Sequence, residues 1–274
     1  LGWPEDPRFG RYWEHCHHII GKDILKTHGI YWPCMLHAMG FRDEQMPTLL
    51  VHGWWNIRGE KMSKSPELEV ALKKFSEFAN FDDSQGAIEG MRRNYERIND
   101  EFSPDEGVTF DRVSAGGVPA EMMSKADSDQ SRVTIYVHGG GYVIGSVRTH
   151  RVLMSKLVTS SGGKVLGLEY RMGPENPFPA AVEDTIAAYR WLLSEGYNPA
   201  KISIAGDSAG GGLVLAALVL IRYLGEPMAG AGVCFSPWVD FEGLGNSMTT
   251  NAEVDPVVAK EGLEFMVQLY IGDR

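Results

Sequence analysis

The chain has 274 residues, of which 43% are hydrophobic and 23% charged, and these proportions are typical of a soluble globular protein with one or two domains. It contains no apolar run near the roughly eighteen residues that a membrane-spanning helix requires, so we expect no membrane span. A net charge of −10 disfavours a general polyanion-binding surface, and with it a nucleic-acid partner, although one local basic patch stays compatible with it.

The N-terminal end has the character of an internal segment. Leu1 is not a start residue, and the stretch 2–7 reads like the middle of a protein. Residues 1–20 lack the basic and then apolar profile of a signal peptide. The three cysteines are scattered and form no CxxC pair: Cys16, Cys34 and Cys234. These features predict a cytoplasmic protein with reduced thiols, and a chain that begins inside a longer one.

The first pattern with chemical meaning lies between residues 15 and 32. Asp23, His28 and Trp32 follow one another at spacings of five and four residues, near a helical repeat, which places the first and last on related faces. Three histidines precede them, at 15, 17 and 18, but no cysteine or carboxylate stands at a spacing suited to a shared metal ion. We therefore interpret these histidines as part of a polar surface and predict no metal site.

A strand, a turn and a lysine-rich loop follow. The apolar run 49–55 predicts a short strand, and Arg58-Gly59 predicts a tight turn. In the loop KMSKS (61–65) the two lysines are suited to neutralising a polyphosphate as charge develops on it. Together with HIIGKD (18–23), YWP (31–33) and HGWW (52–55), this loop resembles the catalytic-domain end of a methionyl-tRNA synthetase, a class I aminoacyl-tRNA synthetase.

The synthetase resemblance covers the first 65 residues and implies part of a Rossmann-like fold. It implies that an amino-acid pocket is lined by Asp23, His28 and Trp32, and that ATP phosphates are contacted by Lys61 and Lys64. The family's other nucleotide signature, the HIGH-type motif, does not occur here, nor does its anticodon-binding part. Half of a nucleotide site binds poorly, so ATP is expected only if this segment functions, and tRNA is not an expected partner.

From residue 66 the pattern alternates between helix and strand. Helical spacing of apolar residues predicts two amphipathic helices at 68–78 and 87–98, and Gly116-Gly117 divides a predicted hairpin, 108–114 and 119–124. Further strands are predicted at 133–137, 164–169, 202–205 and 231–235, and helices at 149–161, 180–195 and 209–224. This alternation indicates a mostly parallel sheet covered on both faces. The strand at 231–235 would be its unfinished edge, where oligomers can form.

One strand-to-helix turn carries a candidate nucleophile. The apolar run 202–205 leads into Gly206-Asp207-Ser208-Ala209-Gly210, and helix-forming residues follow. In a nucleophile elbow the glycines let strand and helix cross closely, and the strained turn presents the serine hydroxyl at the carboxyl end of the strand. An idle serine in a glycine-rich turn would give the same five letters, so this motif alone leaves both interpretations open.

A glycine-rich loop upstream favours the catalytic interpretation. A predicted strand runs into His138-Gly139-Gly140-Gly141-Tyr142, where no side chain obstructs the N–H groups of Gly140 and Gly141. With the N–H of Ala209 they would form an oxyanion hole for the charge that acyl transfer builds on a carbonyl oxygen. A histidine at the start of such a loop more often orients it than acts as a base, so His138 is not a predicted catalytic residue.

Four segments, in order, resemble the alpha/beta hydrolases of the hormone-sensitive-lipase type, which are bacterial carboxylesterases and acetyl hydrolases. They are HGGGYVIGS (138–146), EYRMGPENPFPAAVEDTIAAYRWL (169–192), GDSAGGGL (206–213) and SPWVDFEG (236–243). The resemblance runs from about residue 66 to the C-terminus, with Asn176 where the family usually has histidine. It implies an alpha/beta-hydrolase fold with N-terminal cap helices, and a serine esterase that acts on small esters through Ser208 without a cofactor.

The rest of the catalytic triad has no candidate in the expected order. These hydrolases place serine, acid and histidine in that order along the chain. All eight histidines precede Ser208, at positions 15, 17, 18, 28, 37, 52, 138 and 150. Asp240, Glu253 and Asp255 fall in what resembles the substrate-cap region, so we assign none of them as the acid. The sequence thus predicts a hydrolase that lacks its last strands and turns over weakly.

The two resemblances meet at residues 61–66. Met-Ser-Lys-Ser-Pro-Glu-Leu is a plausible start for a hydrolase, and Lys-Met-Ser-Lys-Ser is a synthetase loop, so the letters MSKS belong to both. No Gly-, Ser- or Pro-rich linker separates the halves. We therefore expect a chimera, with a synthetase segment at 1–65 and an incomplete hydrolase at 66–274. Three functions stay open: a serine carboxylesterase, a methionine-tRNA ligase that uses ATP, and a non-catalytic chimeric chain.

Overall fold

The chain folds into two units, Leu1–Ala71 and Leu72–Arg274. The computed structural model describes residues 17–21, 48–52, 56–57, 60–61, 87–98, 102–250, 252 and 258–272. The domain boundary that we expect between residues 65 and 66 lies shortly before the division between these units and stays a prediction. None of the described helices is both long enough and apolar enough to cross a membrane.

The first unit contains a pair of parallel strands. β1 (His17–Gly21) and β2 (Thr48–His52) pair along their full length. Parallel strands need a crossover of a dozen or more residues, and the sequence between β1 and β2 is long enough for one. β3 (Asn56–Ile57) and β4 (Glu60–Lys61) pair antiparallel on either side of the turn predicted at residues 58–59. β2 confirms the first part of the strand predicted at 49–55.

β1 is not among the predicted strands, and its first residues, His17 and His18, belong to the stretch interpreted as a polar surface. Its letters, His-His-Ile-Ile-Gly, place two polar residues before two apolar ones, so no alternation identifies a strand. Backbone pairing with β2 decides the conformation of His17 and His18 instead. Because a strand hydrogen-bonds through its backbone, this pairing is compatible with many side-chain patterns.

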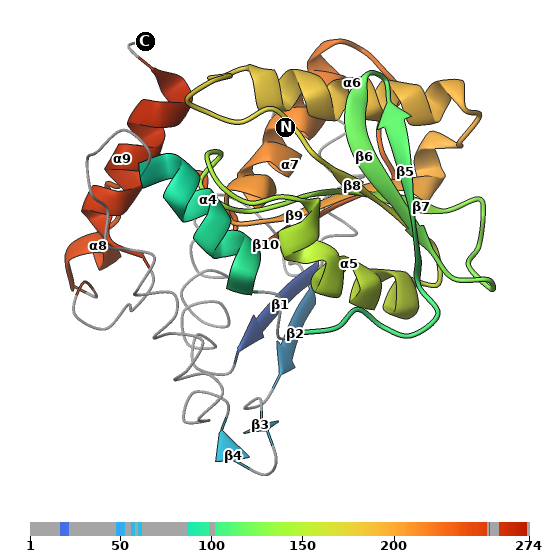
Figure 1. The fold of residues 1–274 in the computed structure, drawn as a ribbon, viewed down its shortest axis with the longest axis horizontal. Coiled ribbons are helices and arrows are strands. Elements are labelled where there is room, and N and C mark those ends of the chain that lie inside the picture. Colours follow the sequence, from blue (N-terminus) through green and yellow to red (C-terminus); the bar gives the residue numbers. More distant parts are fainter. Residues whose placement is uncertain are drawn as a thin grey trace. The chain divides into compact units, whose positions relative to one another are not determined.

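A six-stranded sheet forms the centre of the second unit, in the order β10-β9-β7-β8-β6-β5 (Figure 1). Its strands are β5 (Thr109–Ala115), β6 (Val118–Ser124), β7 (Val133–Val137), β8 (Lys164–Leu168), β9 (Ile202–Asp207) and β10 (Ala231–Phe235). β8, β7, β9 and β10 run parallel, and β6 pairs antiparallel with both β5 and β8. The predicted mostly parallel sheet, its strands and the hairpin at Gly116-Gly117 are confirmed.

Helices cover both faces of this sheet (Figure 1). The described helices are α4 (Ala87–Ile98), α5 (Val147–Ser161), α6 (Ala180–Ser194), α7 (Ala209–Tyr223), α8 (Ser247–Thr250), α9 (Lys260–Ile271) and a 3-10 helix, Pro199–Lys201. α5 packs against one face, and α6 and α7 pack against the other. α4 confirms the helix predicted at 87–98, whereas the helix predicted at 68–78 lies outside the described residues. α5 begins before the predicted residue 149 because Ser146 caps it in a capping box with Thr149.

The central strands are buried on both faces, which explains their nearly uninterrupted apolar sequence. In β7, Ile135 belongs to the core on the α6 and α7 side, and the next residue, Tyr136, belongs to the core on the α5 side. β7 and β9 are neighbours, and Val137 pairs with Gly206 at their carboxyl ends. The loops that follow these two strands therefore start side by side, as the predicted site requires.

β10 lies at one edge of the sheet, as predicted. Its apolar side chains are partly uncovered, with Val233 41% and Phe235 38% exposed. α7, which packs against β9 and β10, also exposes Val219 and Tyr223. An exposed apolar edge strand can pair with a further strand. Formation of oligomers through this edge stays a prediction.

Candidate active site

Ser208 occupies a strained turn between β9 and α7. Its φ of 51° and ψ of −119° are rare for a residue with a side chain. The Ser208 N–H donates to the Phe235 carbonyl at 2.9 Å, and the Ser208 carbonyl accepts from the N–H groups of Gly212 and Trp238 at 3.1 and 2.8 Å. The strain is therefore held in place by α7, β10 and the loop after β10, which is the backbone geometry of a nucleophile elbow.

The glycines on either side of Ser208 are required by close backbone contacts. A Cβ atom on Gly206 would lie 2.5 Å from the carbonyl oxygen of Val137, and one on Gly210 would lie 2.0 Å from the same oxygen. Both distances are shorter than Cβ contacts in real proteins. The first turn of α7 thus crosses the end of β7 at a distance that only glycine permits, as expected for this motif.

The loop after β7 lies beside the elbow and contains two glycine N–H groups that could bind an oxyanion. Gly140 and Gly141 both have positive φ values, 118° and 61°. The Gly140 carbonyl accepts from the N–H groups of Val143 and Ile144 at 3.1 and 2.9 Å, which closes a tight turn. Within the part of the chain that the structure describes, the N–H groups of Gly140 and Gly141 have no backbone acceptor. They are therefore available to an oxyanion.

Ala209 supplies the third predicted donor position. It is the first residue of α7 and is fully buried. The N–H groups in the first turn of a helix have no acceptor within that helix. The fold thus places Ser208, Ala209 and the turn at Gly140 and Gly141 at the carboxyl ends of two adjacent strands.

Asp207, directly before Ser208, is the centre of a network that sequence reasoning missed. Its Oδ1 accepts from the Tyr136 hydroxyl at 2.7 Å and from the Gly139 N–H at 3.0 Å, and it lies 3.4 Å from His150 Nε2. Burial alone would raise the pKa of Asp207, but the hydrogen bond and charge of His150, with the bonds from Tyr136 and Gly139, hold that pKa below its usual value. A carboxylate beside the serine was visible in the sequence, but its partners come from distant positions.

His138 has the contacts of a residue that orients the loop. Its Nδ1 lies 2.8 Å from the Gly139 carbonyl, and its ring stacks on those of Tyr170 and His150, with centroids 4.4 and 5.5 Å away. Burial lowers the pKa of His138 to about 3, with a further contribution from His150, so the imidazole is neutral at physiological pH. These contacts agree with the orienting role that we expected for His138.

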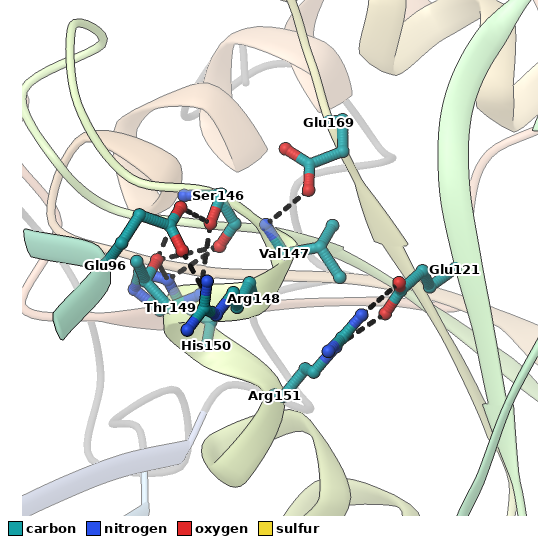
Figure 2. Close-up of polar contacts among 9 residues, drawn as sticks. All are labelled: Glu96, Glu121, Ser146, Val147, Arg148, Thr149, His150, Arg151 and Glu169. Carbon is teal, nitrogen blue, oxygen red and sulfur yellow. Dashed lines mark hydrogen bonds and ion pairs between the residues drawn. The ribbon is translucent and has the colours of Figure 1, made fainter. Parts of the chain in front are cut away.

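The start of α5 is tied to three neighbouring elements (Figure 2). The Ser146 hydroxyl donates to Glu96 of α4, which also pairs with Arg148. Glu169, after β8, accepts from the Val147 N–H at 3.0 Å, and burial raises the pKa of Glu169. Further along α5, Arg151 pairs with Glu121 of β6. His150, between these contacts, is thereby held in a fixed position, with its Nδ1 2.8 Å from the Thr149 hydroxyl.

An apolar cluster adjoins the loop. Met91 of α4, Val143 of the loop and Met266 of α9 pack together and are buried. Met266 lies so close to Gly141 that a Cβ atom there would come within 2.9 Å of the Met266 Cγ. α4 is also tied to the loop by Arg92, whose Nε donates to the Val143 carbonyl at 2.8 Å. The predicted donors therefore lie beside apolar surface.

Within the described residues, no histidine side chain is hydrogen-bonded to Ser208. The described imidazoles of the second unit, His138 and His150, make their contacts with Gly139, Thr149 and Asp207 rather than with the serine. The Asp240 carboxylate accepts three backbone N–H groups of the turn that follows it, at 3.0 to 3.1 Å, which is a structural role. Glu253 and Asp255 lie outside the described residues.

The synthetase-type residues are described only in part. Lys61 lies in β4, and the other predicted ATP contact, Lys64, lies outside the described residues. The predicted amino-acid pocket lies outside them as well: Asp23, His28 and Trp32. The roles of all five stay predictions.

Two family models match this chain. The model of the alpha/beta hydrolase fold matches residues 134–274, and the model of class I tRNA synthetases of the methionine type matches residues 3–84. An acetyl-hydrolase of Streptomyces hygroscopicus is 41% identical over 207 residues, which are 76% of this chain and 68% of the relative. An esterase of Acinetobacter venetianus is 30% identical over 172 residues, or 63% of this chain and 56% of the relative.

Solved structures agree with these matches. The crystal structure of an esterase from the bacterial hormone-sensitive lipase family has 49% identity and a TM-score of 0.73, and the match covers 78% of this chain and 71% of that one. An esterase/lipase from an uncultured bacterium has 39% identity and a TM-score of 0.69, with 76% and 70% covered. The chain thus spans 56% to 71% of the lengths of these four proteins.

Proposed function

Since this chain belongs to the alpha/beta hydrolase family and resembles its hormone-sensitive-lipase-type esterases, we propose that its second unit is built to hydrolyse short acyl esters, with Ser208 as the nucleophile. The observation that carries the proposal is the strained Ser208 beside the N–H groups of Gly140 and Gly141, which have no backbone acceptor among the described residues. The names of the relatives, an acetyl-hydrolase and esterases, support small carboxylic esters as substrates. The chemistry needs no cofactor.

The proposed reaction is acyl transfer to serine. The Ser208 hydroxyl attacks the ester carbonyl, and the N–H groups of Gly140, Gly141 and Ala209 bind the oxyanion that forms. The tetrahedral intermediate expels the alcohol, and water then hydrolyses the acyl-serine. The apolar cluster around Met266, beside the loop, supports binding of a short acyl chain. A base must take the serine proton and return it to the alcohol, and no histidine follows Ser208 in these 274 residues.

We expect these 274 residues alone to hydrolyse p-nitrophenyl acetate only weakly. Triad enzymes that lose a triad member keep mainly oxyanion-hole and binding contributions, on the order of a thousandfold over water. Without a base Ser208 adds little, so Ser208→Ala should change kcat/KM less than about threefold. The measurement is release of p-nitrophenol, with Ser160→Ala, an exposed serine of α5, as the control. Vigorous turnover that Ser208→Ala abolishes would show that a base is present, and His150 would be tested next.

A methionine-tRNA ligase is the second candidate function, supported by the match to class I synthetases over residues 3–84. We expect no methionine-dependent exchange of pyrophosphate into ATP. Activation requires both halves of the nucleotide site to align the phosphates with the carboxylate, and small misplacements cost about a hundredfold in rate. Exchange of radiolabelled pyrophosphate measures this activity. Exchange that disappears in a Lys61→Ala, Lys64→Ala double variant would favour the ligase over the esterase.

A further inference from the structure

Asp207 is bonded to both parts of the candidate site. It is the last residue of β9, directly before Ser208, and its Oδ1 accepts the N–H of Gly139, directly before Gly140, at 3.0 Å. We propose that Asp207 is a positioning residue that holds the oxyanion loop in register with the nucleophile. This inference rests on the proposed esterase function of Ser208.

Gly139 of the loop lies against both the side chain and the backbone of Asp207. A Cβ atom on Gly139 would lie 2.2 Å from Asp207 Oδ2 and 3.0 Å from the Asp207 carbonyl oxygen. The loop therefore runs directly against the carboxylate, and the Gly139 N–H is bonded to one of its oxygens. Hydrogen bonds to an ionised carboxylate are roughly twice as strong as those between neutral groups. The bond fixes the start of the loop one residue before the first oxyanion donor.

The carboxylate is itself held in place by groups outside the loop. The Tyr136 hydroxyl bonds to the same Oδ1 at 2.7 Å, and His150 Nε2 approaches it at 3.4 Å. His150 is anchored in turn by Thr149 and by the Ser146 carbonyl, at the capped start of α5. A fixed acceptor can position a loop, whereas a mobile one cannot. The polar network that ends at Asp207 therefore links α5 to the oxyanion loop.

This geometry matters for rate because an oxyanion hole depends on placement. Donors act when they lie about 2.7 to 3.1 Å from the developing oxyanion, and a shift of about 1 Å has a large cost in rate. Loss of the bond at Gly139 would let the loop at Gly140 and Gly141 move relative to an ester bound beside Ser208. The weak hydrolysis expected of these 274 residues depends mainly on those donors, so it should fall when they are displaced. We expect this loss to lower kcat and to leave KM nearly unchanged, because the apolar contacts of the substrate persist.

The test compares Asp207→Ala, Asp207→Asn and a matched control in the full 274-residue chain. The control is Ser203→Ala, which removes the hydrogen bond between Ser203 and Thr134 that joins β9 to β7 at 2.7 Å, away from the loop. For each variant, amide hydrogen exchange of Gly139 is followed by NMR, and kcat and KM are measured with p-nitrophenyl acetate. Asparagine keeps an acceptor at the Oδ1 position, so it should rescue the loop.

We expect Asp207→Ala to speed exchange at Gly139 at least about tenfold relative to amides inside β7, and to lower kcat about tenfold with KM unchanged. Asp207→Asn and Ser203→Ala should stay within about threefold of the unsubstituted chain in both readouts. If Asp207→Ala fails to fold, Asp207→Glu, which keeps the charge but displaces the acceptor, should show the same loss.

Unchanged exchange at Gly139 in Asp207→Ala would overturn the proposal. So would equal losses of kcat in Asp207→Ala and Ser203→Ala, because the effect would then be a general loosening of the β7–β9 pair. Absence of measurable hydrolysis by the unsubstituted chain would contradict the proposed function instead. The exchange comparison would then decide the positioning role of Asp207 by itself.

Discussion

A chain that begins at Met62 and continues past Arg274 with the C-terminal segment of a related esterase should hydrolyse p-nitrophenyl acetate at least about a thousandfold faster than the 274 residues alone. The strained Ser208 and the proposed donors Gly140, Gly141 and Ala209 already lie at the carboxyl ends of adjacent strands, so we expect the added segment to complete the site by supplying an acid and a histidine. Loss of the serine or histidine of a triad lowers kcat about a millionfold, so adding a histidine and an acid can raise kcat by a large factor.

The edge of the sheet provides a place for such a segment. β10 has no partner on its outer side within the described residues, and the neighbouring face of α7 exposes apolar side chains such as Val219. A further parallel strand and helix would cover both surfaces. A histidine that follows them would reach the carboxyl ends of the strands, where Ser208 lies.

The controls for this experiment separate the two units. Ser208→Ala in the extended chain should abolish the added activity, because the new base acts through that hydroxyl. The extended chain should work equally well with or without residues 1–61, which contribute neither Ser208 nor an oxyanion donor. A folded extended chain that is inactive would contradict the proposed role of Ser208. A need for residues 1–61 would contradict the chimera hypothesis.

Gly210→Ala is expected to destabilise the second unit by about 3 kcal/mol, which lowers its melting temperature by roughly 10 °C. The added Cβ would lie 2.0 Å from the Val137 carbonyl oxygen and 2.7 Å from that of His138. Both partners are backbone atoms at the end of β7, so neither a rotamer change nor a small shift relieves the contact. Either α7 or the oxyanion loop must move. Thermal unfolding followed by circular dichroism measures the effect.

Gly90→Ala is the matched control for this substitution. Gly90 lies inside α4, and the nearest atom to a Cβ there is the end of the Arg93 side chain at 3.9 Å. Alanine in an open helix interior is better than glycine by about 0.5 to 1 kcal/mol, so this variant should unfold at the same or a higher temperature. A Gly210→Ala chain as stable as the unsubstituted one would mean that α7 does not cross β7 as closely as the structure indicates.

Local sequence was sufficient for most of the second unit. Nearly uninterrupted apolar runs predicted β7 and β9 because a strand buried on both faces is largely apolar. Gly206 and Gly210 predicted the turn between β9 and α7, because only glycine lets a strand and a helix cross closely. The structure confirms this steric reason, since a Cβ atom at either position would clash with the Val137 carbonyl oxygen. The helix at 87–98 and the hairpin at Gly116-Gly117 follow in the same way from periodicity and turn chemistry.

The tertiary structure decided what depends on contacts between distant residues. β1 has no strand pattern of its own, and its conformation follows from pairing with β2. The bonds of Asp207 join residues of β7, β9 and α5, so no spacing within a short stretch could predict them. A sequence motif reflects which side chains a local backbone conformation allows, so a short stretch of sequence is enough to recognise it. The partners of a buried carboxylate depend on how strands and helices pack, and packing is fixed only when the whole sheet has formed.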